Sequence, residues 1–366
     1  SEQEFLEAEQ ALDENLKAAI RLAKDNIGHF HSRQHDTVEV IETMPGVRCW
    51  RKSVPIEKVG LYIPGGTAPL FSTVLMLGIP AELAGCNEVI LCSPPRPDGS
   101  IHPAILFAAR LAGIRSVFKT GGVQAIGALA YGTESIPAVY KIFGPGNQYV
   151  TCAKQLVQRR GVSIDLPAGP SEVLVCADHT AYPEFVAADL LSQAEHGADS
   201  QVILVAFEEG MVQEVLAAIE QQLESLPRRD IAQAAMANSV AVVLRTRADA
   251  TEFINAYAPE HLILAVEEAA AFSAGIVNAG SVFLGHYTPE SAGDYASGTN
   301  HTLPTNGYAR TYSGVSLDSF VKKITFQEIT REGIELLGPA VMCMAEAEAL
   351  VGHSRAVSVR MGNNNQ

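Results

Sequence analysis

Three short segments in the second half of this chain carry side chains that bind metals or transfer protons: Gln193-Ala194-Glu195-His196, Pro259-Glu260-His261 and Gly293-Asp294-Tyr295. None of them contains a cysteine. A structural zinc site usually recruits several thiolates, whereas imidazole nitrogen and amide or carboxylate oxygen suit a catalytic zinc or a similar divalent ion. The three segments therefore predict a catalytic metal site.

Glu260 and His261 directly precede a predicted strand at Leu262 to Ala265. Neighbouring side chains at the start of a strand point in different directions. We therefore expect them to act as two separate acid/base groups, which suits two successive proton transfers. A surface-exposed polar dipeptide is the alternative that the residues alone leave open.

Gln193 and His196 fall near the end of a helix predicted over residues 183 to 196. Pro183 suits the first turn of such a helix, and Gly197 suits the position just past its end. Side chains three residues apart share one helix face, so the amide and the imidazole could bind one ion. A histidine at a helix end can equally act as a partner of the helix dipole.

Short apolar runs alternate with helical patterns along the chain. Strands are expected at residues 59–63, 88–92, 116–118, 138–143, 172–176, 202–207, 240–244 and 262–265, and helices in the first 35 residues and at about 71–85, 102–113, 123–132, 183–196, 210–224, 247–256 and 327–350. A β-like run at residues 356–360 follows. This alternation predicts an α/β fold with mostly parallel sheets, whose ligands bind beyond the carboxyl ends of the strands.

Glycine-rich turns follow three of the first four predicted strands, at residues 64–66, 121–122 and 144–147. Such turns allow the backbone to approach a phosphate closely. The segment Gly144 to Tyr149 lacks the third glycine of the dinucleotide fingerprint, however, and no P-loop lysine follows it. The turns alone therefore leave open whether they bind a nucleotide or only reverse the chain.

The composition limits the kind of protein. With 366 residues, 47% of them hydrophobic, the chain can form two α/β domains or more. Its formal net charge of -15 opposes binding to nucleic acid or anionic membrane, and no apolar run reaches the ~18 residues of a membrane span. Six scattered cysteines without CxxC spacing or a secretory leader predict reduced thiols and a cytoplasmic location.

The chain resembles the histidinol dehydrogenase family in six blocks that occur in the family's order: VGLYIPGG (59–66), KIFGPGN (141–147), LPAGPSE (166–172), SQAEHG (192–197), PEHL (259–262) and SAGDYASGTNH (291–301). The resemblance implies oxidation of L-histidinol through histidinaldehyde to L-histidine, with two NAD+ and one zinc ion per subunit. It also implies the roles of Glu260, which activates a water molecule, and His261, the general base.

The resemblance further implies a homodimer whose active sites are shared between subunits. By family pattern the zinc ligands are Gln193, His196, Asp294 and, from the other subunit, His353. The substrate would contact these four residues together with Ser171, His261, His301 and Glu348, and the NAD contacts would be Tyr62, Gln124 and Asn147.

The family plan divides the chain into an N-terminal helical segment (1–45), a Rossmann-like NAD-binding domain (61–170), a second Rossmann-like domain with the metal and catalytic residues (46–60 and 171–316) and a C-terminal helical arm toward the partner subunit (317–366). Both Rossmann-like domains are expected to be incomplete. Family members usually extend further before the position that aligns with Ser1, so the strength of dimer association stays open.

Three other interpretations remain open. The chain could be a related zinc and NAD dehydrogenase for another small amino or sulfonated alcohol. It could be a metallohydrolase in which Glu260 activates water, or a non-catalytic protein that lacks its N-terminal part. The product formed from each candidate substrate distinguishes them.

Overall fold

The structure is a computed structural model that describes residues 1–65, 69–167 and 169–362. Gly66 and Ala168, which belong to two of the blocks quoted above, lie outside the described residues. The chain forms two compact units. The first combines Ser1–Gln34 with Ile56–Phe320, and the second combines His35–Pro55 with the described part of Val321–Gln366.

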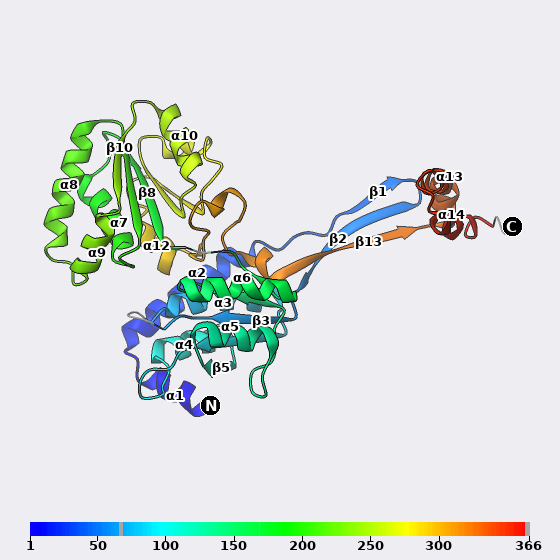
Figure 1. Ribbon diagram of the computed structural model, residues 1–366, viewed down its shortest axis with the longest axis horizontal. Coiled ribbons are helices and arrows are strands. Elements are labelled where there is room, and N and C mark those ends of the chain that lie inside the picture. The colour runs from blue at the N-terminus through cyan, green and yellow to red at the C-terminus, as the bar shows by residue number, and fades with distance from the viewer. Residues whose placement is uncertain (66–68, 168, 363–366) are drawn as a thin grey trace. The chain divides into compact units, whose positions relative to one another are not determined.

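The first unit contains two five-stranded sheets, each of them parallel throughout (Figure 1). The first sheet has the order β5-β4-β3-β6-β7, from β3 (Lys58–Tyr62), β4 (Glu88–Ser93), β5 (Ser116–Lys119), β6 (Lys141–Phe143) and β7 (Ser163–Ile164). The second has the order β10-β9-β8-β11-β12, from β8 (Glu172–Ala177), β9 (Gln201–Ala206), β10 (Val240–Val243), β11 (His261–Ala265) and β12 (Ser281–Leu284). The predicted α/β fold with parallel sheets is confirmed.

Helices cover both faces of the first sheet. The face that carries Val59 and Leu61 packs against α1 (Glu2–Gln10), α2 (Glu14–Ser32), α3 (Phe71–Ala84) and α4 (Pro103–Leu111). The face that carries Tyr62 and Ile90 packs against α5 (Gly122–Tyr131) and α6 (Gln148–Val157). Strands buried on both faces read as continuous apolar runs, which is why these segments were recognisable in the sequence.

The second sheet is covered in the same way. Val173 and Val175 face α7 (Pro183–Ala194), α8 (Glu209–Leu223) and α9 (Arg229–Met236). Leu174 and Cys176 point to the other face, which packs against α10 (Arg247–Tyr257) and α11 (Ala269–Ser273). Figure 1 shows α7, α8 and α9 on one side of this sheet and α10 on the other. A short helix, α12 (Glu290–Tyr295), follows β12 and contacts α7.

Strand order reverses between β3 and β6 in the first sheet and between β8 and β11 in the second. Open parallel sheets bind ligands at such reversal points, beyond the carboxyl ends of the strands. In the first sheet Tyr62, one of the expected NAD contacts, ends β3, and the glycine-rich turn that starts at Gly144 follows β6. In the second sheet Glu172 and His261 are the first residues of β8 and β11, so the acid/base pair lies at the amino-terminal edge instead.

The second unit is an antiparallel sheet of order β1-β2-β13 with two helices: β1 (Val40–Met44), β2 (Val47–Pro55), β13 (Val321–Ile329), α13 (Arg331–Ala347) and α14 (Val351–Ser358). Short 3₁₀ turns occur at Gln158–Arg160, Tyr308–Arg310 and Leu317–Phe320 in the first unit. None of the described helices is long and apolar enough to cross a membrane.

Two predictions for the second unit were wrong. The C-terminal helix does not start near residue 327, because β13 continues to Ile329 in its pairing with β2. The β-like run at 356–360 is not a strand: it continues helix α14 to Ser358 and then turns. Val357 packs against α13 beside Gly338, whereas Ala356 and Val359 are exposed, so helix packing overrides a local β-type pattern.

The segment 46–60, which the family plan assigns to the second Rossmann-like domain, does not pair with the second sheet. Its strand β2 pairs with β13 in the second unit, and β3, which begins at Lys58, joins the first sheet. A local pattern cannot reveal a strand partner so far along the chain. The remaining domain limits stay predictions.

Candidate active site

His261 is buried at the start of β11 and held in one orientation. Its Nδ1 lies 3.0 Å from the backbone oxygen of Glu172 at the start of the neighbouring strand β8. A carbonyl oxygen only accepts, so Nδ1 carries the proton and the neutral ring has its lone pair on Nε2. Nε2 has no hydrogen-bond partner among the described residues and lies 3.5 Å from Asp294 Oδ1. The ring is therefore set to accept a proton at Nε2.

Glu260 is buried beside His261 but is held by a different contact. Its Oε2 accepts a hydrogen bond of 2.8 Å from the backbone N–H of Glu172 and lies 3.6 Å from His261 Nδ1. The carboxylate thus sits near the side of the imidazole ring that is already bound to the carbonyl, and not at Nε2. This arrangement agrees with two acid/base groups that act on different atoms.

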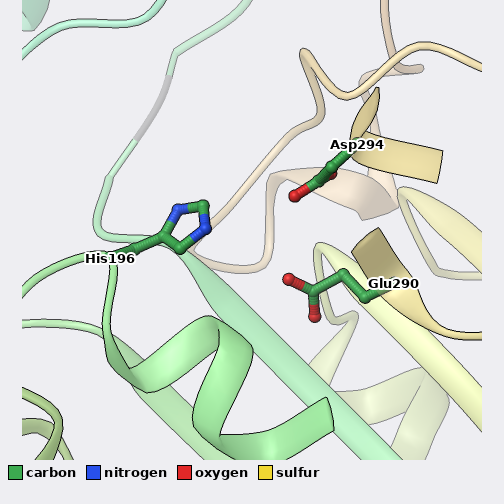
Figure 2. Close-up of side chains that lie close together, drawn as sticks. All are labelled: His196, Glu290 and Asp294. Atoms are coloured by element: carbon green, nitrogen blue, oxygen red, sulfur yellow. The ribbon is translucent and has the colours of Figure 1, made fainter. Parts of the chain in front are cut away.

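A cluster of side chains that could bind a metal ion lies next to Glu260 and His261. One ligand atom each from His196, Glu290 and Asp294 lies within 4.8 Å of the other two. Figure 2 shows the imidazole of His196 and the two carboxylates pointing toward a common space. Asp294 and Glu290 are buried on α12, and His196 follows the end of α7. The contact between α7 and α12 brings these side chains together.

Gln193 lies in the last turn of α7 and is completely buried. Neither its Oε1 nor its Nε2 has a hydrogen-bond partner among the described residues. A buried polar group left without a partner costs about 1–3 kcal/mol. The helix ends at Ala194, two residues before the predicted end, and the N–H of His196 still bonds to the Gln193 carbonyl at 3.2 Å. Gln193 therefore fits a position whose amide oxygen binds an ion.

Burial and charge perturb the acid groups of the site. Burial raises the pKa of Glu260 to about 7 and raises that of Glu290 well above its usual range. Burial alone would lower the pKa of His261, but the nearby carboxylates of Glu260, Glu290 and Asp294 outweigh it and raise the pKa to about 10 without a cation in the site. A divalent cation beside these carboxylates would offset their charge and lower the pKa of His261, which leaves Nε2 able to accept a proton. Several buried carboxyl groups lie close together here, and a positive charge nearby would stabilise their ionised forms.

These residues fit a divalent cation such as zinc. The donors are an amide, an imidazole and carboxylates, which is the ligand chemistry of catalytic zinc sites. Gln193 Oε1 and Glu290 Oε2 are buried without hydrogen-bond partners among the described residues. A cation held by Gln193, His196 and Asp294 would satisfy the amide and compensate the buried negative charge.

His301 is held at both ring nitrogens. Nδ1 lies 2.8 Å from the backbone oxygen of Asp294, and Nε2 lies 3.0 Å from Thr73 Oγ1 on α3. The Asn26 side chain on α2 donates to the Ala296 carbonyl at 2.8 Å. These contacts fix the segment that carries Asp294. The substrate contact expected of His301 stays a prediction.

The other expected site residues lie in separate places. Ser171 directly precedes β8 and is partly buried. Glu348 caps the end of α13, and His353 lies on α14, where both are exposed. These two residues belong to the second unit, so the first unit by itself contains Gln193, His196 and Asp294 of the expected ligand set.

The residues expected to contact NAD lie at or just beyond the carboxyl ends of strands in the first sheet. Tyr62 ends β3, and its hydroxyl oxygen accepts from the Gly122 N–H at 3.1 Å, at the start of α5. Gln124 is exposed in the first turn of the same helix. Asn147 caps α6 through its Oδ1. The structure thus gathers them at the edge where parallel sheets bind nucleotides.

Glu290 was not among the site residues expected from the sequence. Its spacing of four residues before Asp294 is a signal that could have found it, since side chains at that spacing share one face of a helix. The second signal, its proximity to His196, depends on the contact between α7 and α12 and is visible only in the folded chain.

We expect Glu290→Gln to weaken zinc binding by about tenfold or more, as loss of a supporting group beside a metal does. The amide keeps the shape of the side chain but removes the negative charge that the Glu290 carboxylate would carry beside a cation held by His196 and Asp294. Competition with a chromophoric chelator measures the zinc affinity. The matched control is Glu184→Gln, a change at an exposed glutamate in the first turn of α7. Equal zinc affinity in the two variants would contradict the prediction.

Comparison with known proteins gives one consistent result. The family model for histidinol dehydrogenase matches residues 1–361. Histidinol dehydrogenase of Bacteroides fragilis (strain YCH46) is 63% identical over 358 residues, which cover 98% of this chain and 84% of that protein. The chloroplastic histidinol dehydrogenase of Arabidopsis thaliana is 56% identical over 353 residues, which cover 96% of this chain and 76% of that protein.

Solved structures agree. The crystal structure of histidinol dehydrogenase from Elizabethkingia anophelis matches with a TM-score of 0.98 and 59% identity, over 100% of this chain and 84% of that one. An acetylating aldehyde dehydrogenase from Geobacillus thermoglucosidasius matches with a TM-score of 0.53 and 14% identity, over 88% of this chain and 96% of that one, which shows a likeness of fold alone. The chain therefore belongs to the histidinol dehydrogenase family.

Proposed function

We propose that this enzyme oxidises L-histidinol through histidinaldehyde to L-histidine, with two NAD+ as hydride acceptors and one zinc ion per subunit. Its family makes it an oxidoreductase that acts on histidinol in histidine biosynthesis. The cofactors, the two-step course and the residue roles are what the proposal adds. The observation that carries it is the fixed orientation of His261, with Nδ1 bound to the Glu172 carbonyl and Nε2 free to take a proton.

In the first step His261 Nε2 takes the hydroxyl proton of the substrate while the carbon loses hydride to the nicotinamide ring. The alcohol becomes an aldehyde, one NAD+ becomes NADH, and the proton remains on the imidazole until solvent removes it. The carboxylate of Asp294, 3.5 Å from Nε2, stabilises the imidazolium that forms.

In the second step Glu260 takes a proton from a water molecule whose oxygen adds to the aldehyde carbon, and the aldehyde oxygen takes up a proton from solvent, which gives the hydrated aldehyde. Oε2 of Glu260 is anchored by the Glu172 N–H, which orients the carboxylate for this transfer. The hydrated aldehyde is again an alcohol, so His261 removes its proton as before. A second hydride leaves for the second NAD+, and the product is a carboxylate. Retention of the intermediate prevents loss of a reactive aldehyde.

Gln193, His196 and Asp294 would hold the zinc together with His353 of the partner subunit. When bound, the ion supplies a Lewis-acid template that orients the substrate through its imidazole and amino nitrogens. Ser171, His301 and Glu348 would complete the substrate contacts. The enzyme would therefore act as a homodimer with shared sites.

NAD+ would bind at the first sheet, in the domain of residues 61–170, with contacts from Tyr62, Gln124 and Asn147. The support is their common position at or just beyond the carboxyl ends of the strands. A cytoplasmic location is also part of the proposal, and it agrees with six cysteines that are all free thiols.

The number of NADH molecules formed per histidinol tests the two-step course. We expect two, because Glu260 and His261 offer separate proton-transfer groups in one site. Absorbance of NADH after complete conversion of a limiting amount of histidinol gives this number. One NADH with release of free aldehyde would contradict the proposal, and NADH formation only with another alcohol would change the substrate. Substrate hydrolysis without NADH would favour a metallohydrolase.

A further inference from the structure

A buried ion pair outside the active site holds the turn that follows β6. Lys154 on α6 and Asp165 just after β7 lie with Nζ and Oδ1 2.5 Å apart, and their side chains are only 4% and 1% exposed. Burial of two charged groups costs desolvation free energy unless further hydrogen bonds satisfy both groups. Those further bonds all go to the backbone of the chain.

Two of these hydrogen bonds involve the backbone of Gly144. Lys154 Nζ donates to the Gly144 carbonyl oxygen at 2.7 Å, and the Gly144 N–H donates to Asp165 Oδ2 at 2.7 Å. Both polar groups of one peptide residue are therefore bound by the two partners of one ion pair. A third bond, from the Leu166 N–H to Asp165 Oδ1 at 2.7 Å, ties the pair to the chain after β7.

Only glycine fits at position 144. Its φ is +119°, which side-chain-bearing residues rarely adopt, and a Cβ there would collide with the Tyr62 carbonyl oxygen. The turn thus passes directly against the end of β3. It then leads through Pro145 and Gly146 to Asn147, whose Oδ1 caps α6 at Tyr149 and Val150.

We propose that Lys154 and Asp165 are positioning residues for the NAD site, because they fix the turn of residues 144–147 against Tyr62. This inference rests on the proposed NAD site at the first sheet. The turn carries Asn147 and touches Tyr62, so two of the three expected cofactor contacts depend on its course. Lys154 binds the Gly144 carbonyl within the turn. It therefore does not take the role of a P-loop lysine, which binds phosphate groups of the nucleotide.

A purely structural role is the competing explanation. Breaking a buried pair by removal of one partner destabilises a fold through the orphaned charge, whereas replacing both partners by apolar residues is often neutral. The two explanations therefore differ for the double change Lys154→Met with Asp165→Leu. It removes the orphaned charge but leaves both polar groups of Gly144 without their side-chain partners.

The test compares wild type, Lys154→Met and the double variant as zinc-loaded, full-length proteins. Thermal unfolding reports stability, calorimetric titration reports NAD+ affinity, and steady-state rates give separate KM values for NAD+ and histidinol. Loss of a hydrogen bond from a charged group corresponds to about tenfold in an equilibrium constant. We expect both variants to bind NAD+ about tenfold or more weakly, with the KM for histidinol within about twofold of wild type.

Phe107→Leu is the matched control. Phe107 is buried on α4, on the opposite face of the same sheet, so the change destabilises this sheet without touching the turn. Its KM for NAD+ should stay unchanged below its unfolding temperature. Should Lys154→Met fail to fold, the double variant still decides, because its charges are balanced.

The outcomes separate the two claims. Recovery of both stability and NAD+ affinity in the double variant would overturn the positioning role and leave a structural pair. Normal NAD+ affinity in a folded Lys154→Met protein would overturn it as well. Absence of NAD+ binding by the wild-type protein would overturn the proposed cofactor itself.

Discussion

Glu260→Gln should slow oxidation of histidinaldehyde much more than oxidation of histidinol. Glutamine keeps the shape of the side chain and can still accept the Glu172 N–H, but it cannot take a proton from water. Loss of a general base costs about 10²–10⁴-fold in rate. The first hydride transfer does not need that base, so a single turnover with histidinol should still release one NADH at close to the normal rate.

His261→Asn should slow both oxidations by about the same 10²–10⁴-fold, because one base serves both hydride transfers. The asparagine amide can keep the donor bond to the Glu172 carbonyl while the basic Nε2 is lost. Rapid-mixing measurements of NADH formation from each substrate give the two rates. Glu208→Gln, a change at an exposed residue before α8, is the control. Equal losses on both substrates in Glu260→Gln would refute the division of labour.

The sequence predicted the parts of this fold whose signals are local. Strands such as β4 and β8 are buried on both faces, so each is a continuous apolar run whose ends were predicted within one residue. Helix in the first 35 residues was also predicted, and the structure divides it into α1 and α2 for a local reason. Asp13 caps α2 by accepting the Leu16 N–H at 2.9 Å, which starts a new helix.

The second unit was not predictable in this way. Strands β2 and β13 stabilise each other across most of the chain: Lys323 donates to Ser53 Oγ although the two residues are 270 positions apart. Trp50 stacks on Phe326, with ring centroids 5.5 Å apart, in the same pairing. Each strand is half-exposed and has an ambiguous pattern on its own, so its partner decides its structure.

The candidate site shows the same division between local and distant signals. Residue types and the family blocks pointed to His261 and Asp294, but not to the contact that brings α12, which carries Asp294, to the start of β11. The acid/base pair lies at the amino ends of β8 and β11, because the backbone of Glu172 in β8 anchors both side chains. That edge is opposite to the one that parallel sheets usually use. The predicted strand after Glu260 and His261 placed this pair at a strand start, but it did not reveal that the neighbouring strand β8 supplies the backbone groups that hold both side chains.

Two inactive variants should restore activity when they are mixed, if the zinc site is shared between subunits. His353→Ala removes the ligand that each chain would give to its partner, and His261→Asn removes the base from each chain's own site. In a mixed dimer one site combines an intact His261 with His353 of the partner subunit, and the other site carries both lesions. Random exchange makes about half of all dimers mixed, so we expect roughly a quarter of wild-type activity.

This experiment separates the shared site from a site within one chain. The two variants are unfolded together, refolded with zinc and compared with each variant refolded alone, and differently tagged chains report how many mixed dimers form. If each site were complete within one chain, every subunit of a mixed dimer would carry one lesion and activity would stay at the level of the single variants. Absence of recovery despite confirmed mixing would therefore contradict the role of His353 across the interface. Recovery would establish that role, because no single chain in the mixture has both residues.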